Sequence, residues 1–255
     1  DKDIYVDDIL TGGDTIKEVV GYRDCLSQIL KKGGFELKKW SSSHSEVLDG
    51  LNEADIALRP EYFEFEQENS ASLGVLGLRW SPNTDTFSYN EVEFDLKVTK
   101  RSILSNIARI FDPAGWITGV VLSAKIIIQR LWIAGLNWDD KVPEDIAHAW
   151  TTIQDQLPLL NTIKIPRLIC NPDSKELTLI GFSDGSMVGY GATVYIRTKT
   201  DLGYQSNLFI AKSKVAPTKT LTVPRLELCG AQLLAIIMQV AQNALSCTNY
   251  TVTKI

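Results

Sequence analysis

The strongest constraint on the fold lies in the last third of the chain, where three strand-like runs precede one long helical run. Alternating apolar residues predict strands over residues 177–183, 189–197 and 204–211, with Asp-Gly-Ser and Lys-Thr-Asp-Leu-Gly turns between them. Helical spacing of apolar residues begins after Pro224, and residues 250–255 are rich in β-formers again. Strands joined by such short turns are antiparallel neighbours, so this order predicts a β-β-β-α-β arrangement that stops in its fourth strand.

The opening 40 residues predict a β-hairpin, a helix and a strand. Residues 3–10 form a short β-type run, which the turn-forming residues 11–14 close. Apolar residues at helical spacing predict a helix over 15–32, ended by two glycines. Alternation then predicts a strand over 35–40. The chain begins at Asp1 without a methionine, so we expect a fragment whose preceding strands are missing.

The middle of the chain has three successive patterns, a polar stretch, a hairpin and a helical region. Residues 41–72 are rich in serine and acids and predict a solvated linker or insertion. Residues 73–98 predict a second hairpin, with strands over 73–80 and 86–96. Helical periodicity follows over 99–165, where an Asp-Pro-Ala-Gly break and two prolines separate three helices. The whole chain is therefore predicted to be an α+β or α/β multidomain fragment.

Adjacent carboxylates at Asp7 and Asp8 are the sharpest candidate for metal chemistry. In a regular strand neighbouring side chains point to opposite faces, so a tight turn is needed to bring both near one cation. Held in that way, the pair can bind divalent cations that neither carboxylate would hold alone. A solvated turn is the alternative interpretation, because aspartate is common in turns.

A second candidate pair is Asp184, at the end of a predicted strand, and Glu227, early in the predicted helix. The two are 43 residues apart, about the length that three short strands and their turns require. An acid at a strand end and another on a helix packed beside it can converge on cations and phosphate. The alternative is an ordinary Asp-Gly turn beside an exposed helical glutamate.

Any nucleic-acid binding by this chain must use local basic patches, because 26 Lys and Arg against 31 Asp and Glu give a net charge of −5. One such patch comprises Lys212, Lys214, Lys219 and Arg225, with no acid between them in the sequence. A weaker one surrounds the first predicted middle helix, at Lys97, Lys100, Arg101 and Arg109. Both patches are candidates for phosphate contacts, and the alternative for each is a solvated charged face.

Several function classes are excluded by what the sequence omits. The four cysteines form no CxxC pair and have no zinc spacing with the two histidines. Neither Asp-Thr-Gly nor Asp-Ser-Gly occurs, so a retroviral-type aspartic peptidase is rejected. The most apolar stretch, residues 116–134, is interrupted by Lys125, Gln129 and Arg130, and no signal peptide opens the chain. We expect an intracellular protein with no membrane partner.

Three stretches resemble one known family. Tyr5-Val6-Asp7-Asp8 and the helix after it resemble the end of a reverse-transcriptase palm, and LGVLGLRW over 73–80 resembles the hairpin that grips the primer. RSILSNIARIFDPAGW over 101–116, with LW and GLNWD over 131–139, resembles Bel/Pao long-terminal-repeat retrotransposon polyproteins, the region labelled Pao retrotransposon peptidase. The Ser-Asp-Gly-Ser and Arg-Leu-Glu-Leu-Cys-Gly-Ala motifs look like the first half of a ribonuclease H domain.

The resemblance implies a division of the chain and a role for its acids. The implied parts are the palm end (1–40), an acidic linker or insertion (41–72), a primer-grip-like hairpin (73–98), a thumb- or connection-like helical region (99–165) and a truncated ribonuclease H-like domain (166–255). Asp7 and Asp8 match the paired polymerase aspartates, and Asp184 and Glu227 match the first two of four nuclease acids. Both sites would bind two Mg²⁺ or Mn²⁺ ions and are incomplete in this fragment.

The same resemblance implies partners. In the parent protein these are an RNA template, a DNA primer, an RNA:DNA hybrid and the rest of the polyprotein, with nucleic-acid contacts from Tyr5, Gly77, Trp80, Ser186, Lys212, Lys214 and Arg225. The expected location is the cytoplasm, within a virus-like particle, with the nucleus as the alternative. The isolated chain is expected to be inactive in RNA-directed DNA synthesis and RNA hydrolysis. The rival hypothesis is a co-opted or decayed piece that only binds nucleic acid or protein.

Overall fold

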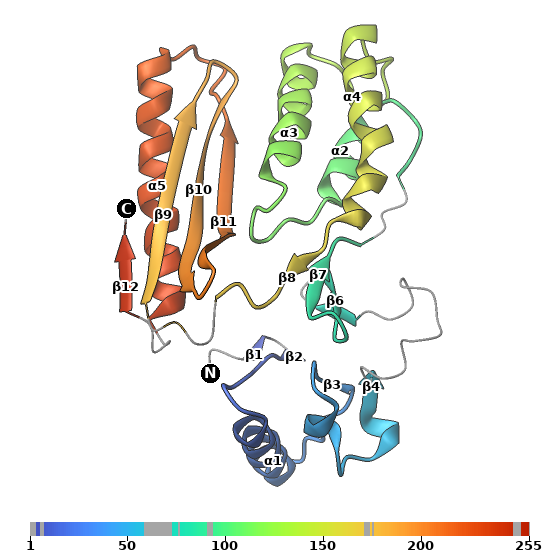
Figure 1. The fold of residues 1–255 in the computed structure, drawn as a ribbon. Coiled ribbons are helices and arrows are strands. Elements are labelled where there is room, and N and C mark those ends of the chain that lie inside the picture. Colours follow the sequence, from blue (N-terminus) through green and yellow to red (C-terminus); the bar gives the residue numbers. More distant parts are fainter. Residues whose placement is uncertain are drawn as a thin grey trace. The chain divides into compact units, whose positions relative to one another are not determined.

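The chain divides into two compact units (Figure 1). The first comprises residues 1–88 and 164–167, and the second comprises residues 89–163 and 168–255. Each unit contains both helices and strands, as the mixed fold class predicts. The structure, a computed structural model, describes residues 4–5, 8–58, 73–75, 77–90, 94–170, 174, 176–246 and 251–254.

Helix α1 (Ile16–Lys32) of the first unit is where the sequence predicts it. The Thr15 side chain accepts a hydrogen bond from the Glu18 N–H at 3.3 Å, and the Glu18 carboxylate accepts one from the Thr15 N–H at 3.1 Å. This reciprocal capping satisfies two donors that would otherwise be orphaned at the helix start. The helix is followed by Gly34 at φ +81°, a left-handed conformation that suits glycine.

The predicted strand over 35–40 is wrong except at its last residue. Only β3 (Trp40–Ser41) is a strand, and Lys39 just before it has φ +57°, which breaks the extended run. β3 pairs in parallel with β4 (Ile56–Leu58). The alternation of apolar residues therefore predicted a longer strand than the chain forms, because the left-handed backbone conformation of Lys39 interrupts the extended run before β3.

Residues 41–58 of the predicted acidic linker or insertion are ordered, which an insertion allows and a solvated linker does not. Two short 3-10 helices, η1 (Ser45–Leu48) and η2 (Glu53–Asp55), occupy this stretch. Leu48 is fully buried, at 0% exposure, and Val47 beside it is buried as well. Two apolar side chains are enough to order a segment whose overall composition is polar. Residues 59–72, the rest of the predicted linker, lie outside the described part of the chain.

The second predicted hairpin is an antiparallel sheet of order β5-β6-β7-β8. Its strands are β5 (Leu73–Val75), β6 (Leu78–Ser81), β7 (Thr86–Ser88) and β8 (Ile165–Pro166). The stretch predicted as one strand over 73–80 folds back on itself next to Gly77, whose φ is +82°. The predicted strand over 86–96 ends at Ser88.

Three helices in the second unit match the prediction. They are α2 (Lys100–Ala108), α3 (Thr118–Ile133) and α4 (Glu144–Gln156), and the 3-10 helix η4 (Leu157–Thr162) follows them. They enclose a core in which Ile103, Leu131 and Trp150 are all at 0% exposure. Pro143 precedes the first residue of α4, and its carbonyl accepts from the Ile146 and Ala147 N–H groups at 3.1 and 2.9 Å.

The predicted β-β-β-α-β order is confirmed in the rest of this unit. It consists of β9 (Glu176–Gly185), β10 (Gly189–Thr200), β11 (Gly203–Val215), α5 (Val223–Leu245) and β12 (Thr251–Lys254). The sheet order is β11-β10-β9-β12, with β12 parallel to β9 and the other pairs antiparallel. A parallel neighbour needs a crossover connection, which α5 supplies.

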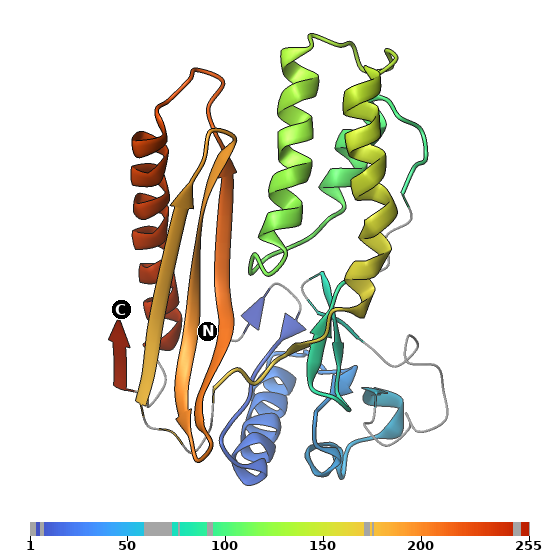
Figure 2. The same cartoon turned by 45° about the horizontal axis from the view of Figure 1, so that its top comes forward.

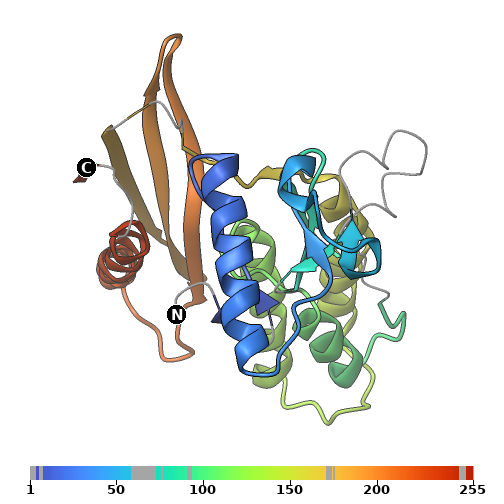
Figure 3. The same ribbon diagram turned by 90° about the horizontal axis from the view of Figure 1, so that it is seen from below.

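Helix α5 lies along one face of this sheet (Figures 2 and 3). Leu233 and Ile237 of the helix pack with Leu179 and Val194 of the sheet, and all four are buried. Among the described helices, α5 has the length and apolar composition to cross a membrane. Apolar core helices of other proteins pass the same test, and α5 buries one side on the sheet.

The edge strand β11 is covered by the turn between α2 and α3. The Ala211 N–H donates to the Ala114 carbonyl at 2.9 Å, so part of this edge is paired. Gly115 has φ +77°, and a Cβ atom there would lie 1.8 Å from the Ala211 carbonyl oxygen. Further hydrogen bonds join α3 to this edge. The Thr118 and Ser213 hydroxyls are 2.9 Å apart, the Ser213 hydroxyl donates to the Thr118 carbonyl at 3.1 Å, and the Gln129 amide donates to the carbonyl of Ala216, just after β11, at 2.6 Å. The helices and the sheet therefore share one compact unit.

Candidate functional site

Asp184 and Glu227 are brought together by direct contact between two backbones. Asp184 is the next-to-last residue of β9, and a Cβ atom on the following Gly185 would lie 2.5 Å from the Glu227 nitrogen. A Cβ atom on Gly230 would lie 2.9 Å from the Asp184 carbonyl oxygen. Side chains are never accommodated at such distances, so glycine at both positions allows the strand end to touch the first turns of α5.

The two carboxylates remain available to a ligand. A Cβ atom on Gly181 would meet Leu234 and Met238 of α5, so Gly181 and Gly185 face the helix. Because successive strand residues point to opposite faces, Asp184 points away from the face that α5 covers. Asp184 and Glu227 are both exposed, and neither carboxylate has a hydrogen-bond or ion-pair partner among the described residues.

This pair fits a divalent cation in part. Carboxylate oxygens are the ligands that Mg²⁺ and Mn²⁺ prefer, and two unpaired carboxylates at one end of a sheet can supply them. Within the described residues no group of three or more His, Cys, Asp and Glu gathers around a single point. The described part of the chain therefore offers two carboxylates to such a site, fewer than a complete set of ligands.

Ser186 lies next to this pair but has a structural role in the hairpin. Its N–H and its hydroxyl both donate to the Gly189 carbonyl oxygen, at 2.8 Å and 3.1 Å. These bonds close the turn between β9 and β10. The side chain is exposed, so the predicted contact with nucleic acid stays a prediction.

The predicted basic residues gather on the α5 face. Lys212 lies opposite Ala192 and Lys214 lies opposite Tyr190 in the register of β10 and β11, and Ala192 belongs to the core beneath α5. Residues paired across strands share a face, so both lysines are on the α5 side of the edge strand. Arg225 lies in the first turn of α5, and all three side chains are exposed.

The first candidate pair is described only in part. β1 (Ile4–Tyr5) and β2 (Asp8–Ile9) form an antiparallel hairpin in which Tyr5 pairs with Asp8, so a hairpin is present where the sequence predicts one. Asp8 is exposed. Asp7 and the side chain of Tyr5 lie outside the described part, so the pairing of the two aspartates stays a prediction.

Trp80 and Gly77 occupy the β5-β6-β7-β8 sheet. The Trp80 indole N–H donates to the Asp85 carboxylate at 3.0 Å, and the Arg167 guanidinium donates to the same carboxylate at 2.6 Å. Trp80 is half-buried and helps to hold β8 on this sheet. Gly77 is exposed at the turn before β6.

One polar pair, formed by the buried Tyr89 and the half-buried Asp112, escapes prediction from the sequence. The Tyr89 hydroxyl donates to the Asp112 carboxylate at 2.9 Å, and the Ile117 N–H donates to its other oxygen at 3.2 Å. Burial raises the pKa of the Asp112 carboxyl, and it raises the pKa of the Tyr89 hydroxyl too. The two residues are 23 positions apart, and the Asp-Pro-Ala-Gly turn is the one sequence signal near them. They brace the turn that covers β11.

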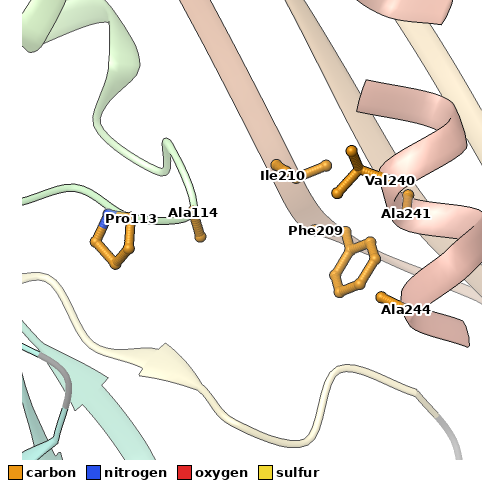
Figure 4. Close-up of a pocket in the computed structure, with 7 residues that line it drawn as sticks. All are labelled: Pro113, Ala114, Phe209, Ile210, Val240, Ala241 and Ala244. Atoms are coloured by element: carbon orange, nitrogen blue, oxygen red, sulfur yellow. The ribbon is translucent and has the colours of Figure 1, made fainter. Parts of the chain in front are cut away.

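An apolar hollow of about 300 Å³ lies beside this turn (Figure 4). Its walls come from the turn, from β11 and from the second half of α5, through Pro113, Ala114, Phe209, Ile210, Val240, Ala241 and Ala244. None of these side chains titrates or donates a hydrogen bond. The hollow therefore has no group that could do chemistry.

Comparison with known families agrees with this geometry. The family model described as the Pao retrotransposon-like RNaseH-like domain matches residues 99–255. The matched range contains α2, α3 and α4 as well as the sheet with α5, which are the elements that the structure places in one unit. No curated protein matches the chain. The chain therefore belongs to the Pao retrotransposon-like RNaseH-like family, a region of Bel/Pao retrotransposon polyproteins.

Proposed function

We propose that residues 168–255 form the first half of a ribonuclease H that hydrolyses the RNA strand of RNA:DNA hybrids in the parent polyprotein. The backbone contact through Gly185 and Gly230 supports this proposal, because it brings the end of β9, which carries Asp184, against the first turns of α5, which carry Glu227. Asp184 and Glu227 would be two of the four acids in the metal site. The other acids of such a site would have to come from outside this pair.

The chemistry that the metal supplies is activation of a water molecule and stabilisation of the leaving oxygen. Asp184 and Glu227 would hold and orient the ions through their exposed oxygens. The exposed cations Lys212 and Lys214, on the α5 side of the edge strand β11, and Arg225, in the first turn of α5, would neutralise hybrid phosphates. The substrate class is therefore a duplex polyanion that contains RNA.

For the first unit we propose the end of a reverse-transcriptase palm with a primer-gripping hairpin. The β1-β2 hairpin supports this, because it pairs Tyr5 with Asp8 of the Tyr-x-Asp-Asp motif. Asp7 and Asp8 would bind the two ions of RNA-directed DNA synthesis, and the turn at Gly77 would approach the primer. We propose the cytoplasm, within a virus-like particle, as the location.

Hydrolysis of a labelled RNA:DNA hybrid with Mg²⁺ tests the nuclease proposal. The 255-residue chain is compared with a longer polyprotein segment that includes the remaining acids, each beside Asp184→Asn and Glu227→Gln. Metal catalysis supplies several kcal/mol, so we expect either substitution to slow the longer segment by about a hundredfold or more. Asp201→Asn, at an exposed acid in the turn between β10 and β11, is the matched control and should leave the rate unchanged.

The outcomes separate the two hypotheses. If the longer segment still hydrolyses the hybrid after Asp184→Asn, Asp184 is not a residue of the nuclease site. Hybrid binding by both proteins with no hydrolysis by either would support the rival hypothesis of a piece that only binds nucleic acid. The two-carboxylate geometry predicts that the 255-residue chain alone binds the hybrid without cutting it.

A further inference from the structure

The outer edge of β11 is uncovered over the first half of the strand. The turn before α3 pairs with this edge at Ala211, but no described residue forms a hydrogen bond with the outer edge over residues 204–208. Tyr204, at the start of this stretch, is 68% exposed. Such an edge offers a row of N–H and C=O groups to another strand.

The backbone groups that point outward follow from the hairpin that joins β10 to β11. Its two-residue loop, 201–202, is closed by a hydrogen-bonded pair of the two strands. Because inward and outward residues alternate along an antiparallel strand, the N–H and C=O groups of Tyr204, Ser206 and Leu208 point away from β10. The register shift after Leu208 changes this phase by one residue, which agrees with the Ala211 N–H, also on the outer edge.

This outward set is symmetric about Ser206, so the edge is complementary to a second copy of itself. When two copies lie antiparallel with Ser206 opposite its counterpart, Tyr204 of each copy lies opposite Leu208 of the other. All three positions then present outward groups on both strands, and the three pairs make about six backbone hydrogen bonds. A shift by one residue would set outward groups opposite inward ones and lose these bonds.

The side chains of this edge also favour pairing with a second copy. Soluble proteins protect exposed edges with charges and prolines, whereas residues 203–211 contain neither. The pairing sets the ring of Tyr204 opposite the aliphatic side chain of Leu208, which is a stabilising cross-strand pair. At each end Asp201 of one copy lies one register position from Lys212 of the other, so the charges there are complementary.

The apolar hollow gives this pairing a second contact (Figure 4). Leu202 in the loop between β10 and β11 is fully exposed. In the same register it lies opposite Ile210, which forms part of the wall of the hollow. Because the lining is apolar throughout, it suits an aliphatic side chain. Each copy therefore carries both the leucine and the hollow that receives it, as a twofold contact requires.

We propose that the uncovered half of β11 is a dimerisation edge, on which a second copy of this chain pairs antiparallel about Ser206 and places Leu202 against the hollow. The sheet becomes continuous across the two copies. Asp184 lies at the other end of the strands, in the register of Ser213, so the pairing leaves the candidate nuclease site of each copy open. Dimerisation requires neither metal binding nor hydrolysis.

Sedimentation velocity of the 255-residue chain over a wide range of concentration tests the edge, and we expect an equilibrium between monomer and dimer. Ser206→Lys, at a side chain exposed in the monomer, sets two like charges opposite each other and should raise the dimer dissociation constant about tenfold or more. Leu202→Ser removes the apolar contact from an exposed loop and should raise it about three- to thirtyfold. Ser123→Lys, at an exposed serine of α3, adds the same charge away from the edge and should leave it unchanged, as should Asp184→Asn.

Disulfide cross-linking tests the register of the pairing. The Cα atoms of the two copies of Ser206 would be about 5.5 Å apart, within reach of a disulfide. The two copies of Gln205 would be diagonal neighbours about 7 to 8 Å apart, which is too far. On mild oxidation Ser206→Cys should therefore form covalent dimers in higher yield than Gln205→Cys or the unaltered chain, which has cysteines of its own.

Three results would overturn the proposal. A monomer at every concentration would leave this edge to an extended segment of another protein. Dimers that persist equally in Ser206→Lys, Leu202→Ser and the unaltered chain would place the contact elsewhere on the molecule. Equal cross-linking of Ser206→Cys and Gln205→Cys would exclude pairing about Ser206.

Discussion

Gly115 is the residue at which one added methyl group is expected to cost the most. Its φ is +77°, and a Cβ atom would lie 1.8 Å from the Ala211 carbonyl oxygen, which is fixed backbone. Gly115→Ala must therefore either move the turn away from β11 or break the hydrogen bond between Ala211 and Ala114. We expect a loss of about 3 kcal/mol or more in the free energy of unfolding, measured by urea denaturation.

Gly135→Ala is the control that separates the cost of the steric clash from the cost of a left-handed backbone conformation. Gly135 also has a positive φ, +65°, but a Cβ atom there would have nothing within 4 Å. Its substitution should cost only the left-handed conformation, about 1 kcal/mol. If Gly115→Ala and Gly135→Ala lower the free energy of unfolding equally, the turn at Gly115 is not in close contact with β11.

Asp112 gives a pH dependence whose sign follows from its burial. Burial is the largest influence on the pKa of this carboxyl and raises it, although the Tyr89 hydroxyl and backbone N–H groups bond the carboxylate. A carboxyl with a raised pKa binds its proton more tightly in the folded chain. Its contribution to stability is therefore complete below the unfolded-state pKa of about 3.9 and is lost as pH rises through the folded-state value.

Urea unfolding of the chain and of Asp112→Asn across that pH range measures this contribution. Asparagine does not ionise, and its amide has one acceptor oxygen where the carboxylate has two. It cannot accept from both the Tyr89 hydroxyl and the Ile117 N–H, so the variant should be less stable by about 1 to 3 kcal/mol. The stability difference between the two proteins should shrink as pH rises. Asp139 provides the contrast, because the pKa of its carboxyl is lowered by Arg101 and Asp139→Asn should show the opposite trend. A difference that grows with pH at Asp112 would contradict the argument.

At the scale of elements, the sequence predicts what is long and periodic. The helices α1, α3 and α5 and the strands β9, β10 and β11 were all predictable, because each repeats one apolar pattern over many residues. Some short elements were not. The positive φ of Lys39 interrupts the extended run before β3, and burial of Leu48 orders a stretch of polar composition. Neither the backbone angle of one residue nor the burial of another can be read from local composition.

The residues of the candidate site were predictable from the sequence, but the contacts that bring them together were not. Asp184 and Glu227 stand out by motif and spacing, but their proximity depends on Gly185 and Gly230 meeting another backbone. The sequence shows glycines there without showing what they touch. The hydrogen bond between Tyr89 and Asp112 joins two segments that are distant in the sequence, so no sequence pattern predicts it.

Helix α1 and the segment after it are joined by one arginine, and this contact can be tested. The Arg23 guanidinium donates to the Val47 carbonyl at 2.7 Å and to the Asp49 carbonyl at 2.8 Å. Hydrogen bonds from a charged donor contribute about 1.5 to 3 kcal/mol. Arg23→Met should therefore lower hydrogen-exchange protection in residues 45–58 by about one to two orders of magnitude. Lys31→Met, at an exposed lysine of the same helix, should change nothing, and equal protection in both variants would contradict a tie through Arg23.

At the scale of the whole molecule, the second unit does not separate into a helical part and a sheet. The family match begins at residue 99, before α2, and the turn at Ala114 pairs with β11. The helical segment predicted as thumb- or connection-like thus covers the edge of the RNaseH-like sheet. A sheet edge left unpaired promotes association with other chains, which gives a physical reason for the two parts to occur together.

If the helices and the sheet fold as one unit, damage in the helical core must reach the sheet. Trp150 is at 0% exposure among the helices, and its indole N–H is buried without a partner. Trp150→Leu leaves a cavity but also removes that orphaned donor, so we expect a loss of about 2 to 4 kcal/mol. Native-state hydrogen exchange should show the same loss at Val194 and Ile196 of β10 as at the amides of α4. Leu159→Ala, at a side chain 63% exposed, is the control and should leave both regions unchanged. Loss of protection confined to α2, α3 and α4 would mean that the helices open independently and that β11 keeps its protection without them.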